Sequence, residues 1–445
     1  MRARQLEPRP APARGPLRRP ALSELPLRGY RLERWTEACF GAGPALMEGG
    51  FVGVIADKLF HVHPAVLALV TAAPMFGNLS SSLWARLAHG RRRVPWTAAL
   101  MAAFTLCVAG VVAIPEGTAG AALLVGLQIV SRQLLGGVTT LRSIVWTLNY
   151  GREVRGKLTA RLSMISTVSF VATSWLGGQL LEANPQNFRL AYALGALASA
   201  VGVFAFSRVP LAGEAEHLAE ERSAAHHATG GVLALLRADR LYARFLGWQM
   251  IGGISNMMVE APVLYLVSRE MQASYSESIA ATMVVPFALA LVTIPFWALF
   301  IDRVHVTAFR AVHGWTFTLS QLLLWLGAGV HSLPLVFVSR CVQGAARGGG
   351  ALAWSLGHND FATRERAGLY MGVHVTLTGI RGAIAPFLGM ALYVGWSAHS
   401  LYGGALELPA WRGLGDGLMP VAAALSAASA IGFRRLQKSI QALQT

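Results

Sequence analysis

The sequence predicts an all-α integral membrane protein in which twelve transmembrane helices form two pseudo-symmetric six-helix bundles. The first observation is composition: the 445 residues are 54% hydrophobic and 13% charged, with a mean hydropathy of +0.48, which soluble domains of this length rarely combine. The second is a series of apolar runs of about 20 residues, each long enough to cross a hydrocarbon core of roughly 30 Å. The third is an internal repeat that relates the two halves.

The apolar runs predict helices rather than barrel strands, because they are too long and too uniformly apolar for the alternating pattern of a barrel. In chain order, the predicted spans are 35–57, 64–86, 94–114, 120–147, 162–182, 190–207, 245–267, 279–301, 311–330, 335–357, 369–394 and 416–433.

The segments outside the spans divide the chain into domains. Residues 1–34 contain nine Arg and several Pro without an apolar core, so we expect a flexible basic cytoplasmic tail. The longest polar interval predicts a cytoplasmic linker at 208–244. It separates an N-terminal bundle, 35–207, from a C-terminal bundle, 245–434, and a short cytoplasmic tail follows at 435–445.

The charge distribution indicates a membrane orientation. A net charge of +16 would suggest a nucleic-acid partner in a soluble protein, but 29 Lys and Arg fall on the side of both ends and every second loop, against 4 in the opposite loops. This is the positive-inside pattern. We therefore expect an integral protein of a bacterial inner (plasma) membrane with both termini cytoplasmic, in contact with lipid and not with nucleic acid.

The repeat relates residues roughly 210 positions apart. The run SRQLLGG at 131–137 aligns with SRCVQGA at 339–345, and Glu48 aligns with Glu260. Matches of this kind follow the same order along both halves, which chance does not readily produce. The two halves are thus expected to be structural repeats.

A second repeated pattern, R-E-x-x-G, occurs at 152–156 and 364–368. The first copy comes within one residue of a P-loop, but Leu158 follows Lys157 where a Ser or Thr would hold Mg²⁺, and no strand precedes it. We therefore expect no nucleotide cofactor. Both turns face the cytoplasm, and we expect a cytoplasmic gate made of Arg152, Glu153, Arg155, Asp302, Arg303, Arg364, Glu365 and Arg366.

Short motifs carry a family resemblance. R-Q-L-L-G at 132–136 and R-C-V-Q-G at 340–344 resemble an R-x-x-Q-G motif, matched in full by the second copy, and W-A-L-F-I-D-R at 297–303 resembles the D-R part of a loop motif. The first-half loop at 84–93 keeps the basic run but lacks the Asp. Over residues 35–434 the chain resembles the major facilitator superfamily of secondary transporters, which implies alternating access.

The resemblance has two further implications. The loop Asp of that family locks the inward-closed arrangement through a charge contact, a role that falls to Asp302 alone in this chain. Drug/proton antiporters of the family carry a Gly-Pro-rich signature in span five, whereas residues 169–181 contain no Pro. This departure disfavours drug efflux, which stays open as an alternative.

Polar side chains inside the spans are the candidate site, because a charge at the bilayer centre costs at least ~2.5 kcal/mol and usually has a compensating role. We expect them to line a cavity between the bundles that binds solute and protons. The alternative is that they form fixed ion pairs between helices. These residues are Glu48, Asn256, Glu260, Arg132, Arg340, Gln343, Arg347 and Arg381.

The sequence therefore predicts a proton-coupled secondary transporter for a small solute of anionic character, because the deep Arg residues outnumber the Glu residues. A cationic solute bound by the Glu pair, and a non-transporting sensor of the same fold, are the other hypotheses. We expect no enzyme, since G-x-S-x-G and H-E-x-x-H are absent. His61 and His63 lack partners at ligand spacing, so we expect no metal, and we expect no cofactor and a monomer.

Overall fold

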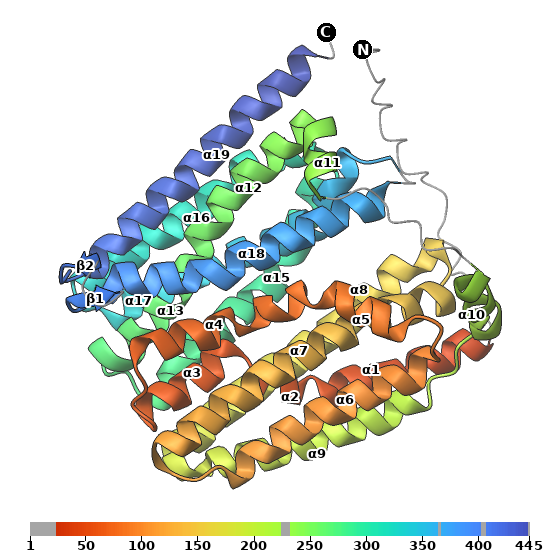
Figure 1. The fold of residues 1–445 in the computed structure, drawn as a ribbon, viewed down its shortest axis with the longest axis horizontal. Coiled ribbons are helices and arrows are strands. Elements are labelled where there is room, and N and C mark those ends of the chain that lie inside the picture. The colour runs from red at the N-terminus through yellow and green to blue at the C-terminus, as the bar shows by residue number, and fades with distance from the viewer. Residues whose placement is uncertain (1–23, 224–231, 364–365, 402–405, 444–445) are drawn as a thin grey trace.

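The computed structural model describes residues 24–223, 232–363, 366–401 and 406–443. These residues form two helical bundles that lie side by side, with the first bundle below the second in Figure 1. In the described part of the chain, nine helical segments are long and apolar enough to cross a membrane, and Pro64–Leu79 is a shorter apolar helix. The helical membrane fold and its two bundles are confirmed.

The first bundle is built from nine α-helices and two short 3-10 turns. They are α1 (Glu24–Phe40), α2 (Ala42–Leu46), α3 (Gly49–Lys58), α4 (Pro64–Leu79), α5 (Ser81–Ala88), α6 (Arg93–Gly110), Val111–Ala113, α7 (Gly117–Asn149), α8 (Arg152–Ala183), Pro185–Asn187 and α9 (Phe188–Ser207).

The second bundle contains two π-helical turns, η3 and η4, among its α-helices. Its elements are α12 (Arg240–Met258), α13 (Glu260–Tyr265), η3 (Leu266–Glu270), α14 (Tyr275–Ile279), η4 (Ala280–Val284), α15 (Val285–Ile301), α16 (Val306–Gly329), α17 (Leu333–Leu356), a 3-10 turn (Gly357–Asp360), α18 (Ala367–Val394), a 3-10 turn (Gly415–Gly417) and α19 (Leu418–Ala442).

Helix α1 begins at Glu24, inside the segment expected to be a flexible tail. Its Glu33 side chain is fully buried and accepts hydrogen bonds from Trp146 and, at 2.8 Å, from the Tyr150 hydroxyl. Arg142 forms ion pairs with Glu33 and Glu37. These contacts with α7 hold the first helix in place, which is why residues 24–34 are ordered as a helix despite their polar sequence.

A two-stranded antiparallel hairpin, β1 (His399–Leu401) with β2 (Leu406–Leu408), lies between α18 and α19. Just before β1 and just after β2, the rings of Trp396 and Trp411 pack with centroids 4.8 Å apart, and the backbones of these two residues form an antiparallel β-bridge. The all-helical prediction did not include this element. We call this end of the molecule the hairpin end, and the opposite end, which carries α10 (Glu214–Ser223) and α11 (Val232–Ala238), the linker end (Figure 1).

Helix α10 is held against the first bundle by its carboxylates. Glu214 accepts a hydrogen bond from the Arg93 backbone N–H at 2.7 Å and pairs with Arg92 at 3.3 Å. Glu221 accepts from the Gly90 N–H at 3.1 Å and pairs with the buried Arg93 guanidinium. The segment that connects the two bundles therefore neutralises two arginines, Arg92 and Arg93, at the start of α6.

Polar contacts join the two bundles at the hairpin end. Asp57, at the end of α3, is 2% exposed and forms an ion pair with Arg269 of η3. The Arg269 guanidinium also donates to the Val62 carbonyl at 3.0 Å, and the Ser276 N–H donates to Glu182 at 3.0 Å. Helix α4 packs along α18 between the bundles. These contacts close the hairpin end in this conformation.

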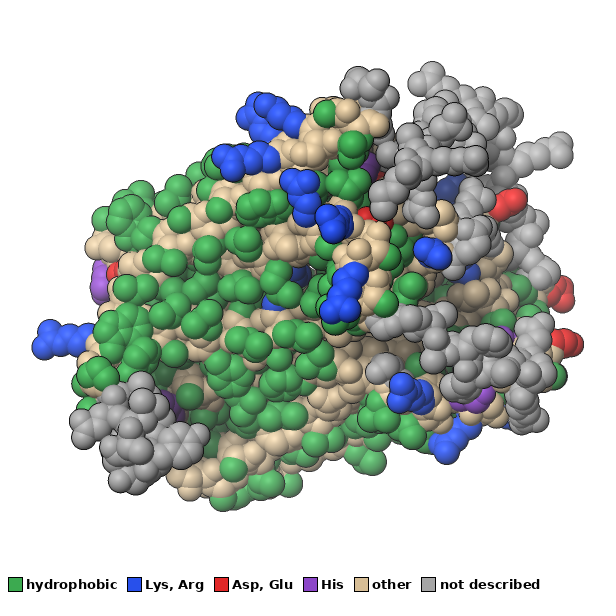
Figure 2. Space-filling view, turned by 45° about the horizontal axis from the view of Figure 1, so that its top comes forward, with side chains coloured by type: hydrophobic (Ala, Val, Ile, Leu, Met, Phe, Trp, Pro, Cys, Tyr) green, Lys and Arg blue, Asp and Glu red, His purple; other side chains and the backbone are tan. Residues whose placement is uncertain are grey.

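The surface between the two ends is apolar, as lipid contact requires. In Figure 2, hydrophobic side chains spread across the visible face, and most of the visible Lys and Arg side chains lie towards the linker end. Large apolar side chains such as Leu106, Leu197 and Phe296 are more than 60% exposed. We conclude that this apolar surface faces the hydrocarbon core of the membrane.

Candidate functional site

Two helices are interrupted at positions that correspond in the repeat, and a Glu lies at or next to each interruption. Between α2 and α3, Glu48 has an extended backbone with φ −73° and ψ 146°, and it precedes Gly49 and Gly50, which disfavour helix. Between α12 and α13 the break falls at Val259, and Glu260 opens the new helix. Such breaks free backbone groups that side chains can bind inside a membrane protein.

In the first bundle, Arg132 of α7 binds the groups that the helix break leaves free. Its guanidinium pairs with the Glu48 carboxylate at 2.7 Å. The same guanidinium donates to the carbonyls of Met47 at 2.9 Å and Pro44 at 3.1 Å. Since Arg132 is only 6% exposed, this is a buried charge that is neutralised and hydrogen-bonded at once.

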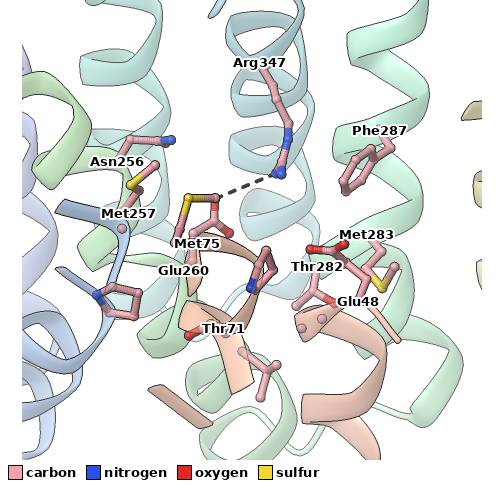
Figure 3. Close-up of a pocket in the computed structure, with 16 residues that line it drawn as sticks. Glu48, Thr71, Met75, Asn256, Met257, Glu260, Thr282, Met283, Phe287 and Arg347 are labelled. Carbon is pink, nitrogen blue, oxygen red and sulfur yellow. Dashed lines mark ion pairs between the residues drawn. The ribbon is translucent and has the colours of Figure 1, made fainter. Parts of the chain in front are cut away.

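In the second bundle, Glu260 is shared among three side chains of α17. It lies 3.4 Å from the Arg340 guanidinium, 3.1 Å from the Gln343 amide nitrogen and 3.9 Å from Arg347. Figure 3 shows the longer contact with Arg347 as a dashed line. Arg340 also donates to the Ala281 carbonyl at 3.0 Å. No single contact of Glu260 is as short as the one Glu48 makes.

A glycine in each arginine-bearing helix fixes this geometry. A Cβ atom on Gly136 of α7 would lie 2.6 Å from the Gly77 carbonyl oxygen, and one on Gly344 of α17 would lie 2.7 Å from the Pro286 carbonyl oxygen. Both glycines therefore let two helix backbones touch, as small residues do in membrane bundles. This explains the Gly that ends both copies of the arginine motif.

A cavity of about 180 Å³ lies between the two bundles. Its lining includes Glu48 from the first bundle and Asn256, Glu260 and Arg347 from the second. Figure 3 shows Glu48 and Glu260 approaching this cavity from different helices. Thr71 and Met75 of α4 also line it. The two carboxylates that the repeat relates thus face one compartment.

A second cavity, of about 310 Å³, adjoins the first and shares Met75, Asn256, Met257 and Arg347 with it. It extends into the second bundle and is lined by Arg381 of α18 and Arg310 of α16. The Arg381 guanidinium donates to the Gln249 carbonyl at 2.6 Å. The polar residues predicted within the spans therefore divide between two adjoining cavities and the ion pairs that border them.

Solved transporter structures superpose on most of the chain, although no protein-family model and no curated protein sequence matches it. A mutant of the nucleoside transporter NupG has a TM-score of 0.69 at 13% identity, covering 93% of this chain and 99% of that one. An inward-open structure of the xylose transporter XylE from E. coli has a TM-score of 0.65 at 11% identity, with 91% and 95% covered. The chain has the major facilitator fold.

Other structures with the major facilitator fold agree with this placement. A POT family transporter in complex with a conjugated peptide has a TM-score of 0.64 at 13% identity and covers 94% of this chain and 96% of that one. At these identities the likeness shows the fold, so the chemistry of the site has to be argued from the residues of this chain.

Sequence reasoning missed Arg310, because the predicted span began one residue after it. The signal that identifies it is helical spacing: Arg310, His313 and Phe317 follow at i, i+3 and i+7 and all three line the second cavity. It also missed the ion pair between Asp57 and Arg269. Those two positions are related by the repeat, since 269 − 57 equals 260 − 48.

The described residues of the expected gate lie at the linker end of the molecule, and the gate stays a prediction. Glu153 and Arg155 belong to the first turn of α8, which begins at Arg152; Asp302 ends α15 and Arg303 follows it; Arg366 precedes α18. Arg364 and Glu365 lie outside the described residues. The ion pair that joins the bundles in this conformation, Asp57 with Arg269, is at the opposite end.

Proposed function

We propose that this protein is a proton-coupled secondary transporter that moves a small solute across the membrane by alternating access. The observation that carries the proposal is the pair of carboxylates, Glu48 and Glu260, placed at corresponding helix breaks and facing one cavity between two bundles. Sites at a repeat interface, built on interrupted helices, are the arrangement that alternating access uses. The likeness to solved transporters of the same fold supports it.

The contacts of Glu260 suggest how a proton is coupled. The proton affinity of a carboxylate depends on the cations and donors around it, and Glu260 has three such neighbours on α17 at 3.1 to 3.9 Å. A rearrangement of α13 against α17 would change these contacts and release or bind a proton. Glu260 is therefore the proposed proton carrier, and Glu48, held more tightly by Arg132, is the second candidate.

The proposed orientation puts the linker end in the cytoplasm. The basic residues concentrated towards that end support it. In this orientation the ion pair between Asp57 and Arg269 closes the outer side, so the conformation is an outward-closed one. Opening to the outside then requires that this ion pair break while contacts form at the linker end.

Reconstituted vesicles provide the test. Purified protein in liposomes that contain a pH-sensitive dye is challenged with a panel of labelled sugars, nucleosides, peptides and organic acids under an imposed proton gradient. We expect gradient-driven accumulation of one solute class, accompanied by proton flux. Glu260→Gln should abolish accumulation while preserving solute exchange, because Gln keeps the shape but does not titrate.

Glu216→Gln is the matched control, because Glu216 is an exposed residue of α10. Equal accumulation by wild type, Glu260→Gln and Glu48→Gln would refute proton coupling through these carboxylates. Solute binding without flux in any direction would favour the sensor of the same fold. Accumulation of cations alone would favour direct binding by the Glu pair.

A further inference from the structure

The second cavity carries an excess of positive charge. Arg310, Arg347 and Arg381 line it, and no Asp or Glu is found among the described residues of its lining. The nearest ion pair belongs to Arg347, whose guanidinium lies 3.9 Å from Glu260 in the adjoining cavity. Uncompensated charge inside a membrane bundle is costly, so this concentration of arginines needs an explanation.

The two innermost arginines have unused hydrogen-bonding capacity. The buried Nε atoms of Arg310 and Arg381 lack a hydrogen-bond partner within the described structure. Gln249, which is 5% exposed and also lines the cavity, has an unpartnered Oε1 atom. Arg132 and Arg340 differ from these, because each of them already binds a carboxylate and a backbone carbonyl.

The remaining walls suit a compact ligand with an apolar part. Phe317 and Trp354 line the cavity, and the indole N–H of Trp354 donates to Thr378 at 3.3 Å, which holds its ring in place. A volume of about 310 Å³ lies at the small end of the range for ligand pockets. That space accommodates a small aromatic or aliphatic body beside one charged group.

We propose that this cavity binds a small organic anion, with its carboxylate or phosphate between Arg310 and Arg381 and its apolar part against Phe317 and Trp354. Guanidinium groups bind both oxyanions through paired hydrogen bonds. Bound there, the anion would supply the negative charge that the protein lacks. The identification of this anion as the transported solute rests on the proposed function, but its binding does not.

Gly253 offers a way to disturb the arginine without removing its charge. A Cβ atom at this position would lie 2.3 Å from the Cζ atom of Arg381, because the guanidinium packs directly on the backbone of α12. The obstructing atoms are the end of a flexible side chain. Gly253→Ala should therefore shift the guanidinium and leave the helix intact.

The test is direct binding by isothermal titration to the full-length protein in detergent. The probes share a benzene ring: benzoate, phenyl phosphate, neutral benzamide and cationic benzylamine. We expect one or both anions to bind, and the neutral and cationic probes to bind at least tenfold more weakly. Benzoate and phenyl phosphate separate a carboxylate site from a phosphate site. Arg310→Gln, Arg381→Gln and Gly253→Ala should each weaken anion binding about tenfold or more.

Arg435→Gln serves as the matched control, because Arg435 is exposed near the end of α19. Equal binding of neutral, cationic and anionic probes, or no anion binding at millimolar concentration, would overturn the proposal. So would anion binding that persists in all three cavity variants. Vesicle flux separates the two claims. Anion binding without flux refutes transport and leaves this site intact. Flux of non-anionic solutes leaves transport intact and refutes the identification of the bound anion as the transported solute.

Discussion

The two halves of the protein place a Glu and an Arg at corresponding positions but surround the Glu with different partners. In the first half, Arg132 binds Glu48 at 2.7 Å and donates further hydrogen bonds to two backbone carbonyls. In the second half, Glu260 is divided among Arg340, Gln343 and Arg347 at longer distances. Leu135 stands where the second motif has Gln343. The repeat thus preserves the positions of the charged residues. The number of partners around each Glu decides whether its contacts are fixed, as for Glu48, or can exchange, as for Glu260.

The largest expected effect comes from removing the arginine of the fixed half. Arg132→Met leaves Glu48 and two carbonyls without their donor, so we expect the free energy of unfolding to fall by about 3 kcal/mol, near the lower end for a broken buried pair. Arg340→Met should cost about 1–2 kcal/mol, because Gln343 and Arg347 remain beside Glu260. Thermal unfolding in detergent measures both changes.

A larger loss for Arg340→Met than for Arg132→Met would reverse the assignment of fixed and exchangeable halves. The double variant Arg132→Met with Glu48→Gln is the control for the Glu48 carboxylate that the single variant leaves unpaired. It should recover part of the lost stability, because an unpaired carboxylate no longer remains at the break.

The next effect concerns a place where the repeat puts opposite charges at corresponding positions. Asp57→Asn removes the ion pair with Arg269 that joins the bundles at the hairpin end. We expect a shift of about 1–2 kcal/mol towards conformations open at that end, or roughly a 5- to 30-fold change in population. Labelling of a single cysteine placed at Met75, with Cys39, Cys107 and Cys341 replaced, reports the change.

Charge exchange sharpens this comparison. Asp57→Arg combined with Arg269→Asp restores the pair with its direction reversed, and the pseudo-twofold relation between the positions predicts that labelling returns towards the wild-type rate. If the exchanged pair labels as fast as Asp57→Asn, the ion pair is not what closes this end.

A smaller change makes the second half resemble the first. Gln343→Leu introduces the residue found at Leu135 and removes one hydrogen bond to Glu260, but it also removes an unpartnered buried oxygen of the amide. We expect a loss of about 0.5–1 kcal/mol of stability. In this background Arg340→Met should cost more than it does in the wild type. If the losses of unfolding free energy simply add in the double variant, Gln343 and Arg340 do not compensate for each other in binding Glu260.

The smallest expected effect is on how the docking of α10 at the linker end depends on pH. Asp302 stands in the second half where Gly90 stands in the first, since 302 − 90 also equals 212, and Gly90 receives the carboxylate of Glu221 instead. Burial raises the pKa of Glu221, but the Gly90 amide and the Arg93 charge outweigh it, and the pKa is lowered overall.

A lowered folded-state pKa means that Glu221 stabilises the docking of α10 above the ordinary Glu range, and that this contribution is lost as the pH falls through the lowered value. Hydrogen exchange of α10 amides, corrected for the intrinsic rate, should therefore show weaker protection at pH 4 than at pH 7. Glu221→Gln should reduce that difference. An unchanged difference would assign the pH dependence to other carboxylates.

Much of the fold could be predicted because lipid imposes a strong constraint: long apolar runs become helices. The central carboxylates and the arginine motif stood out for the same reason, as polar groups where lipid disfavours them. The contact of Asp57 with Arg269 could not be predicted, because it depends on how two bundles meet. The helical start at Glu24 and the hairpin of β1 and β2 likewise depend on tertiary contacts rather than on apolar periodicity.

The glycine contacts of α7 and α17 constrain the mechanics of the proposed cycle. With no side-chain layer between α7 and α4 at Gly136, or between α17 and α15 at Gly344, neither arginine-bearing helix can roll about its long axis without a steric collision. Each helix therefore stays fixed, and the guanidinium that it carries keeps the same position and orientation. The part left to move is the short segment α13 beyond the break of the second half, so Glu260 changes position while the arginines stay in place.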